Sequence, residues 1–312
     1  MFQRINAFIE KWMAFVTPTC LVLGVCFPDI AGHGVPFVPY VFALMTFTGS
    51  LKSTFADVFH VFRHPKPLVV TLVIIHIVMP LAACGVGHLF FRDDPNLIAG
   101  MVLEFCVPTA VVALMWVSIY GGNSPLSLSL VVTDTIMAPF IIPAALHIFI
   151  GSKVEMDAAQ MMKELVFMIA IPALAAMCLN KISHDRVKET WPSKLALISK
   201  IALIFVVTSN SSKVAPYVRD MNMQRFWTAV AILVLAASGY AVGWLAARIM
   251  KKDRDMTVSM IYGAGMRNIS AGAVIAAAYF PGEVMFPVII GTLFQQVLAA
   301  CYGKIIEKRL GT

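Results

Sequence analysis

Charged side chains are scarce in this sequence. Asp, Glu, Lys and Arg make up 13% of the 312 residues, whereas a soluble domain carries about a quarter. Hydrophobic residues account for 59% of the chain, and its mean hydropathy is +0.82. This composition excludes an ordinary soluble domain and predicts an integral membrane protein.

The chain also lacks the patterns of metal-dependent and nucleophilic enzymes. Its six cysteines have no metal-ligand spacing and fall in or beside apolar segments, which favours free, packed thiols. It has no H-E-x-x-H metal pair and no nucleophile elbow. Gly263-x-Gly265 is too short for a dinucleotide site and lacks a strand–turn–helix setting. We therefore expect no enzyme, no bound metal and no cofactor.

Ten apolar segments can cross a bilayer as helices, some of them with their flanks, because a crossing takes about 20 residues. They are residues 12–27, 36–51, 67–90, 96–120, 124–150, 161–180, 194–215, 225–250, 257–280 and 283–305. We predict an all-α polytopic membrane protein with ten transmembrane helices.

The net charge of +7 follows the predicted membrane topology and does not indicate a nucleic-acid partner. With the N-terminus inside, cytoplasmic segments hold 17 of the 24 basic residues and outer segments hold six, which leaves Arg267 within the membrane. Because cytoplasmic loops are enriched in Lys and Arg, both termini are predicted to be cytoplasmic, in the plasma or inner membrane of a cell. The dense basic run at residues 248–254 is expected to attract anionic lipid headgroups.

Ten crossings divide into two sets of five. We expect a first repeat at residues 1–152 and an inverted second repeat at residues 153–312, because an odd number of crossings makes the halves antiparallel. The fourth and ninth spans are then equivalent, and both contain helix breakers: Pro108 in one, Gly263 and Gly265 in the other. We predict that both helices break and cross near the midplane, where their N-terminal dipoles would face an anion. Simple kinks are the alternative.

Arg267 stands in the middle of the ninth span, between Met266 and Asn268. An unpaired arginine in hydrocarbon is costly, and intramembrane charges usually mark a substrate or ion path. Its guanidinium could hold a substrate carboxylate bidentately, or it could serve as a tethered cation where an ion would otherwise bind. Both roles predict an organic anion as the ligand.

Several short motifs follow one another along the chain, from His76-Ile77-Val78-Met79-Pro80 in the third span to Gly265-Met266-Arg267-Asn268 in the ninth. By their order and spacing, they resemble the bile acid:sodium symporter family over nearly the full chain. In the ninth span the family signature E-x-G-M-Q-N is similar to Gly265-Met266-Arg267-Asn268. In the third span its Q-x-x-x-M-P is similar to His76-Ile77-Val78-Met79-Pro80. Further matches in the fourth and fifth spans are Pro108, Gly122-Asn123, Leu126-Ser127 and Ala138-Pro139.

The resemblance implies a division of the helices into a moving core and a panel. The core would comprise approximately residues 67–150 and 225–305, including the two broken helices, with its crossover at Pro108, Gly263, Gly265 and Met266. The panel would comprise approximately residues 12–51 and 161–215.

The chain departs from the family at its sodium ligands. The resemblance places a sodium-binding glutamate of the family at Gly263, a sodium-binding glutamine at His76 and the signature glutamine at Arg267. Apolar residues occupy three further polar positions of the family: Ala113, Leu114 and Val131. Among the ligand positions that can be placed, only Ser127 keeps a side-chain oxygen. Because sodium needs several oxygen ligands, we expect both family sodium sites to be lost.

The placement of polar residues within the apolar spans, together with the resemblance, predicts two groups of functional residues. The candidate substrate contacts are Thr109, Ser127, Thr133, Arg267, Asn268 and Gln296. The candidates for ion or proton coupling are the deeply placed ionisable residues His76, Glu104 and Asp134. For His76 the alternative is a hydrogen-bonded packing role, and for Glu104 it is a position near a water-filled vestibule. For Asp134 an ion pair with Arg267 is the preferred role.

These features predict a secondary transporter that moves a small or amphipathic organic anion by alternating access. Sodium is not expected as the coupling ion, and transport would be proton-coupled or would proceed by facilitated diffusion or exchange. One alternative is a sodium-coupled symporter with a relocated sodium site. The other is a channel or a non-transporting ligand sensor on the same scaffold.

Overall fold

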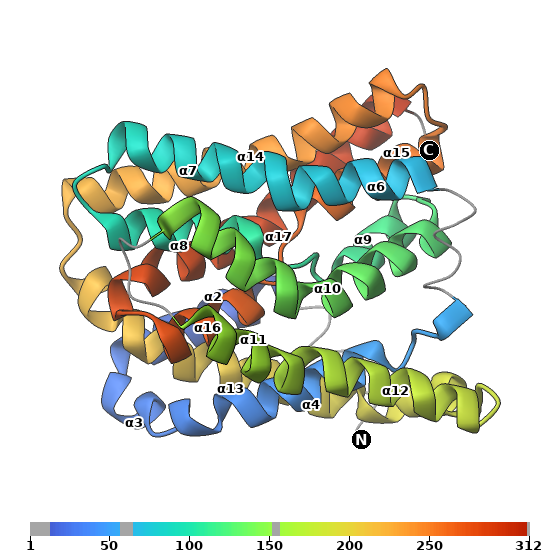
Figure 1. Ribbon diagram of the computed structural model, residues 1–312, viewed down its shortest axis with the longest axis horizontal. Coiled ribbons are helices and arrows are strands. Elements are labelled where there is room, and N and C mark those ends of the chain that lie inside the picture. The colour runs from blue at the N-terminus through green and yellow to red at the C-terminus, as the bar shows by residue number, and fades with distance from the viewer. Residues whose placement is uncertain (1–12, 57–64, 152–156, 311–312) are drawn as a thin grey trace.

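The computed structural model describes residues 13–56, 65–151 and 157–310, and every regular element in these ranges is a helix (Figure 1). This confirms the all-α prediction. Seven helical stretches are long and apolar enough to cross a membrane: Pro28–Ser50, Pro65–Phe90, Ser124–Ile150, Ala158–Ile182, Arg186–Arg219, Met223–Ile249 and Gly282–Leu310. Their length and composition indicate a multi-pass membrane protein.

The other three predicted spans are not long continuous helices in the described residues. The first corresponds to α2 (Met13–Cys26), the fourth to α8 (Pro95–Cys106) with α9 (Ala113–Ile119), and the ninth to α15 (Arg254–Gly265) with α16 (Ile269–Tyr279). The number of ten crossings therefore stays a prediction. So does the inverted repeat, whose expected boundary at residues 152 and 153 lies outside the described residues.

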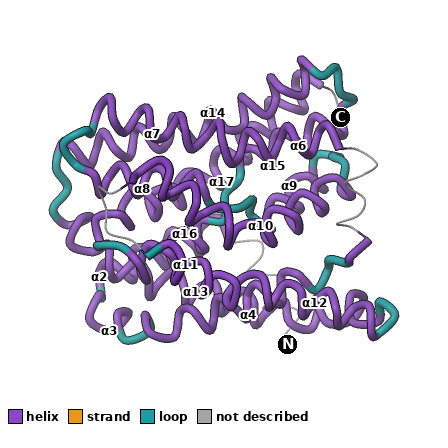
Figure 2. The backbone as a smooth tube through the Cα atoms, in the orientation of Figure 1, coloured by secondary structure: helices purple, strands orange, loops and turns teal. Residues whose placement is uncertain are grey.

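The helices gather into two bundles, which Figures 1 and 2 show one above the other. The lower one, here the small bundle, contains α2, α3 (Pro28–Gly32), α4 (Val38–Ser50), α11 (Ala158–Leu165), α12 (Ile171–Ile182) and α13 (Arg186–Arg219). The upper one, here the crossing bundle, contains α6 (Pro65–Val73), α7 (Met79–Phe90), α8, α9, α10 (Ser124–Ile150), α14 (Met223–Ile249), α15 and α17 (Gly282–Leu310). Although α16 lies beside α2 and α11 in Figure 1, it belongs with the crossing bundle because it packs against α17 and α8. Within the small bundle, α13 packs along α2, α3 and α4. From the crossing bundle, α10, α16 and α17 make contacts with helices of the small bundle.

Two helices contain a short π-helical stretch just before a proline. Proline has no N–H, so the carbonyl four residues earlier loses its helical partner and the ladder rearranges locally. Pro80 follows the stretch η3 (Ile74–Val78), and Pro172 follows η5 (Val166–Ala170). His76 therefore lies in an irregular turn of its helix, where π geometry is often associated with function.

The first broken helix ends at Cys106 because of Pro108. The residue before a proline is driven out of the helical region, and Val107 is extended, with φ −67° and ψ 152°. The chain resumes helical geometry at Ala113. The interruption predicted at Pro108 is thus a break of several residues and not a kink.

The second break lies opposite the first, and the two are joined through their backbones. Thr109 and Arg267 form an isolated antiparallel bridge. Two backbone hydrogen bonds connect the segments: from Asn268 N to Pro108 O at 2.7 Å and from Ala110 N to Met266 O at 3.2 Å. The broken helices therefore meet at a crossing, as the sequence predicts.

The glycines of the ninth span have a different role from the one expected. Gly263 and Gly265 lie inside the last turn of α15, and the break itself comprises residues 266–268. A Cβ on Gly265 would lie 2.3 Å from ring atoms of Tyr240, and one on Gly263 would lie 2.4 Å from a methyl carbon of Leu130. The main effect of these glycines is to let neighbouring helices approach α15 closely.

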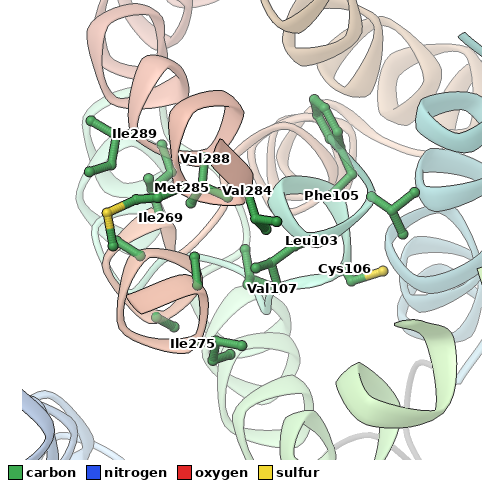
Figure 3. Packing of buried hydrophobic residues seen from close by; sticks show 14 of the residues in the cluster. Leu103, Phe105, Cys106, Val107, Ile269, Ile275, Val284, Met285, Val288 and Ile289 are labelled. Carbon is green, nitrogen blue, oxygen red and sulfur yellow. The ribbon is translucent and has the colours of Figure 1, made fainter. Parts of the chain in front are cut away.

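The end of α8 packs against α17 and α16 in a dense apolar cluster (Figure 3). Leu103, Cys106 and Val107 lie on the α8 side, and Val284 and Val288 lie on the α17 side. This packing holds the first break in place on the side of α16 and α17. The opposite side of the break is open to the small bundle.

We predict that Gly265→Ala destabilises the protein by about 1–3 kcal/mol, because an added methyl overpacks a tight contact. Tyr240 cannot retreat easily, since its ring stacks on Tyr302 and its hydroxyl donates to Gln295 O. The readout is the melting temperature of the detergent-purified protein. Gly85→Ala in α7 is the control, because a Cβ there meets no atom within 4 Å. Equal melting temperatures for the two variants would contradict the prediction.

Candidate functional site

A cavity of about 250 Å³ lies between the two bundles, beside the crossing. Side chains of α4 and α13 form the wall from the small bundle, and both breaks, α10 and α17 form the wall from the crossing bundle. Most of the lining is apolar. The polar lining residues are Thr46, Ser50, Ser53, Thr135, Asn210, Ser211, Arg267, Asn268, Ser270, Thr292, Gln295 and Gln296.

Arg267 reaches this cavity from the second break. Its backbone is fixed by the bridge to Thr109 and by its N–H, which donates to Gln295 Oε1 at 2.9 Å. Its side chain is 2% exposed, and none of the three guanidinium nitrogens has a hydrogen-bond partner in the described protein. Arg267 is also the only charged residue among the described residues that line the cavity. The guanidinium nitrogens are themselves buried, so an anion that reached them from the cavity would find five unused N–H donors.

Two carboxylates act on the guanidinium without touching it. Asp134 and Glu104 both interact electrostatically with Arg267. Among the described residues, however, the ion pairs within 4.0 Å are His76–Asp134 and Arg92–Asp93. The direct ion pair expected between Asp134 and Arg267 is therefore not formed, and the charge of Arg267 is balanced only at longer range.

Asp134 instead joins the third span to the first break. Its Oδ1 lies 2.8 Å from His76 Nε2, and its Oδ2 accepts from Thr109 N at 2.7 Å. The hydroxyl of Thr109 donates in turn to Gly263 O at 3.1 Å. This chain ties the irregular turn at His76 to both breaks, so a change of charge at His76 or Asp134 would act directly on the crossing.

Glu104 is buried away from the cavity. It is 2% exposed, it does not line the cavity, and its Oε2 has no partner in the described protein. A Cβ on Gly291 would lie 2.2 Å from Glu104 Oε1, so the glycine in α17 makes room for this carboxylate. The packing of α17 over the side chain gives the vestibule interpretation no support, and that interpretation stays a prediction.

The structure brings part of the predicted substrate site together. Pro108, Arg267, Asn268 and Gln296 line the cavity. Two of these side chains are already engaged: Asn268 Oδ1 accepts from Ala271 N at the start of α16, and Gln296 Oε1 accepts from Trp116 Nε1. Asn268 thus caps the helix that begins at the cavity, where a helix N-terminus favours an anion.

Three predicted contacts do not line the cavity in this structure: Thr109, Ser127 and Thr133. Thr109 is fully buried and its hydroxyl is used within the crossing. On α10 the lining residues are Val131, Val132 and Thr135, so Thr133 points along another side of the helix. Ser127 lies a full turn before Val131, towards the start of α10.

The site contains residues that the sequence reading missed. Gln295, next to the predicted Gln296, holds the Arg267 backbone. Asn210 is 1% exposed, lines the cavity from α13, and has no partner for its amide nitrogen or oxygen in the described protein. A signal was present, because residues 208–212 form a polar run, Thr-Ser-Asn-Ser-Ser, inside an apolar span. No group of three or more potential metal-ligating side chains occurs in the part of the chain that the structure describes.

Comparison with known proteins identifies relatives along nearly the whole chain. Residues 39–221 match the model of the Sodium Bile acid symporter family. The uncharacterized protein YbaS of Bacillus subtilis is 40% identical over 95% of this chain and 97% of its own length. YocS of the same bacterium, named an uncharacterized sodium-dependent transporter, is 22% identical over 98% of this chain and 95% of its own length.

A plant protein is also similar to most of the chain. The probable sodium/metabolite cotransporter BASS1 of Arabidopsis thaliana, a chloroplast protein, is 24% identical over 93% of this chain and 72% of its own length. YocS and BASS1 are named as transporters, which confirms the expectation of a transporter over an enzyme.

We predict that Asp134→Leu destabilises the protein, because Thr109 N–H and His76 lose their acceptor. An unpaired buried donor costs about 1–3 kcal/mol, and the loss would appear as a lower melting temperature in detergent. Thr133→Val is the control on the same helix, since the Thr133 hydroxyl has no partner in the described protein and its removal should be neutral or stabilising. An Asp134→Leu protein as stable as the control would show that the carboxylate does not hold the break.

Proposed function

Because the chain belongs to the sodium bile acid symporter family, we propose that it is a secondary transporter that carries a small organic anion by alternating access. One observation is the basis for proposing an anion as the substrate. Arg267 lines the cavity, its buried guanidinium has no partner for any of its nitrogens in the described protein, and no other charged residue among those described lines that cavity. A substrate carboxylate would accept two parallel N–H bonds from it, a strong and directional contact.

The size of the cavity favours a small substrate. Pockets for drug-sized ligands occupy roughly 300–1,000 Å³. The volume here, about 250 Å³, is below this range and suits a short carboxylate better than a sterol-sized amphipath. The apolar side chains around Arg267, among them Val131, Val206 and Ile289, would contact the hydrocarbon part of such an anion.

The two bundles provide the moving parts of the proposed cycle. The small bundle would act as the panel and the crossing bundle as the core, with the cavity at their interface. The complete protein would have ten crossings in two inverted repeats, residues 1–152 and 153–312, with both termini in the cytoplasm. Rocking of the crossing bundle would then expose the cavity to each side of a plasma or inner membrane in turn.

Sodium is not part of the proposed cycle. Where the resemblance places oxygen-bearing ligands of the family, this chain has Gly263 and His76. Gly263 packs on Leu130, and His76 bonds to Asp134. Two relatives are named as sodium transporters, so a relocated sodium site is the competing possibility. If an ion is coupled, the proton is our candidate, with His76, Asp134 and Glu104 as its carriers.

We predict that Arg267→Gln abolishes stabilisation of the protein by short carboxylates such as butanoate. The neutral side chain keeps a polar head of similar shape but offers neither a charge nor a fork of donors. Arg267→Lys keeps the charge alone and should retain weakened binding. Ligand-induced shifts in melting temperature report binding, and the ligand-free melting temperatures report folding. Wild-type binding by a folded Arg267→Gln protein would contradict the role of this side chain.

We further predict that anion transport persists when sodium is absent. Proteoliposomes loaded with unlabelled butanoate should show saturable counterflow of labelled butanoate at equal rates in sodium, potassium and choline buffers. Counterflow distinguishes a carrier from a channel or a sensor, because only a carrier exchanges labelled for unlabelled substrate against a gradient. A strict requirement for sodium would restore the ordinary symporter mechanism and leave the fold unaffected.

A further inference from the structure

Asn210 is a second lining residue of the cavity whose buried side-chain polar atoms have no partner in the described protein. It lies on α13 in the small bundle, whereas Arg267 belongs to the crossing bundle. Its side chain is as deeply buried as that of Arg267, and both its Nδ2 and its Oδ1 lack a hydrogen-bond partner in the described protein. Buried side-chain amides normally have partners, so this exception requires an explanation.

The neighbours of Asn210 show that α13 can satisfy its own polar side chains. Ser211 Oγ donates to Val207 O at 2.7 Å, and Ser212 Oγ donates to Ser209 O at 2.6 Å. These serines therefore need nothing from outside their helix. The amide of Asn210 cannot be explained as one more member of the same polar run, because it alone among these three side chains is left open.

We propose that Asn210 binds a second polar group of the transported anion, while Arg267 binds its carboxylate. This inference rests on the proposed function and specifies its substrate class. An amide presents two N–H donors and a carbonyl acceptor, so a complementary ligand group must both accept and donate. A hydroxyl or a carboxamide meets both needs, whereas a plain alkyl chain meets neither. The assignment does not depend on which amide atom is oxygen, since both are unpartnered.

The substrate would accordingly be a short hydroxy- or carboxamide-bearing carboxylate that spans the cavity. Its two ends would contact different bundles, so binding would join the two parts that move relative to each other. An apolar carboxylate of the same length would fill the same space and contact Arg267, but it would leave the Asn210 amide unpaired. Discrimination against such a ligand follows from the cost of the unpaired group.

The test compares ligands that differ only in the second polar group. The panel contains butanoate, its α-, β- and γ-hydroxy derivatives, and succinamate, and binding is measured from melting-temperature shifts and from competition with butanoate counterflow. In the wild-type protein at least one substituted ligand should bind about tenfold tighter than butanoate, the equivalent of one good hydrogen bond. Asn210→Leu should remove that advantage and leave butanoate affinity within about twofold.

Two controls separate recognition from folding. Ser211→Ala changes an adjacent lining residue whose hydroxyl is already used by its own helix, so the discrimination should persist. Ligand-free Asn210→Leu should melt no lower than the wild type, because a buried polar group without a partner has been replaced by an apolar one. A lower melting temperature would show that the amide supports the fold, and this would count against the proposal.

The outcomes also separate this inference from the proposed function. Wild-type protein that binds butanoate through Arg267 but shows no preference for the substituted ligands would overturn the role of Asn210 alone. A preference that survives Asn210→Leu would do the same. If no member of the panel binds and Arg267→Gln changes nothing, both the anion site and its specificity are refuted.

Discussion

The structure depends on satisfying the backbone groups that two helix breaks leave open in an apolar interior. An unpaired peptide group in such surroundings costs several kcal/mol, so a break survives only where partners are at hand. Here each break supplies partners for the other, through the bonds from Asn268 N to Pro108 O and from Ala110 N to Met266 O. The remaining N–H groups of the bridge go to side chains: Thr109 N to Asp134 and Arg267 N to Gln295.

Two groups of buried polar side chains lie at the crossing and the cavity, apart from Glu104, Ser127 and Thr133, which have unpartnered atoms but do not line the cavity. His76, Asp134 and Gln295 are engaged in holding the crossing. The side chains of Arg267 and Asn210 have no partner in the described protein, and these two residues line the cavity from opposite bundles. Each unsatisfied group lowers the stability of the empty protein. Because Arg267 and Asn210 also line the cavity, we assign ligand recognition to the second group and architecture to the first.

Much of this organisation could be predicted from the sequence. Pro108 and Arg267 each stand out in an apolar span, and an isolated breaker or charge in such a span has few structural explanations. The faces of α10 and α17 were harder to assign. Thr133 and Thr135 differ by two residues, yet only Thr135 lines the cavity, and Gln295 holds the crossing while Gln296 bonds to Trp116. Such differences depend on helix rotation, which packing fixes.

Asn210 was missed for another reason. Hydroxyls and amides look alike in a polar run such as residues 208–212, but the serines there can bond to their own helix, as Ser211 and Ser212 do. Only the three-dimensional arrangement reveals that the Asn210 amide has no partner and meets the cavity opposite Arg267. The role of the glycines was missed for a similar reason: the Tyr240 ring, which is distant in sequence, leaves no room for a side chain at Gly265.

A tethered cation has a consequence for energetics that a bound ion does not have. A sodium ion crosses the membrane with the substrate and so delivers the energy of its gradient. The guanidinium of Arg267 returns with the protein in every cycle, so it can balance the substrate charge but cannot drive accumulation. Under the proposed mechanism, concentrative transport therefore needs another ion. In the described interior, His76 and Asp134 are hydrogen-bonded to each other, and Asp134 bonds directly to the first break at Thr109. A proton gained or lost there would change the contact that holds the crossing, which is the coupling that the fixed charge of Arg267 cannot supply.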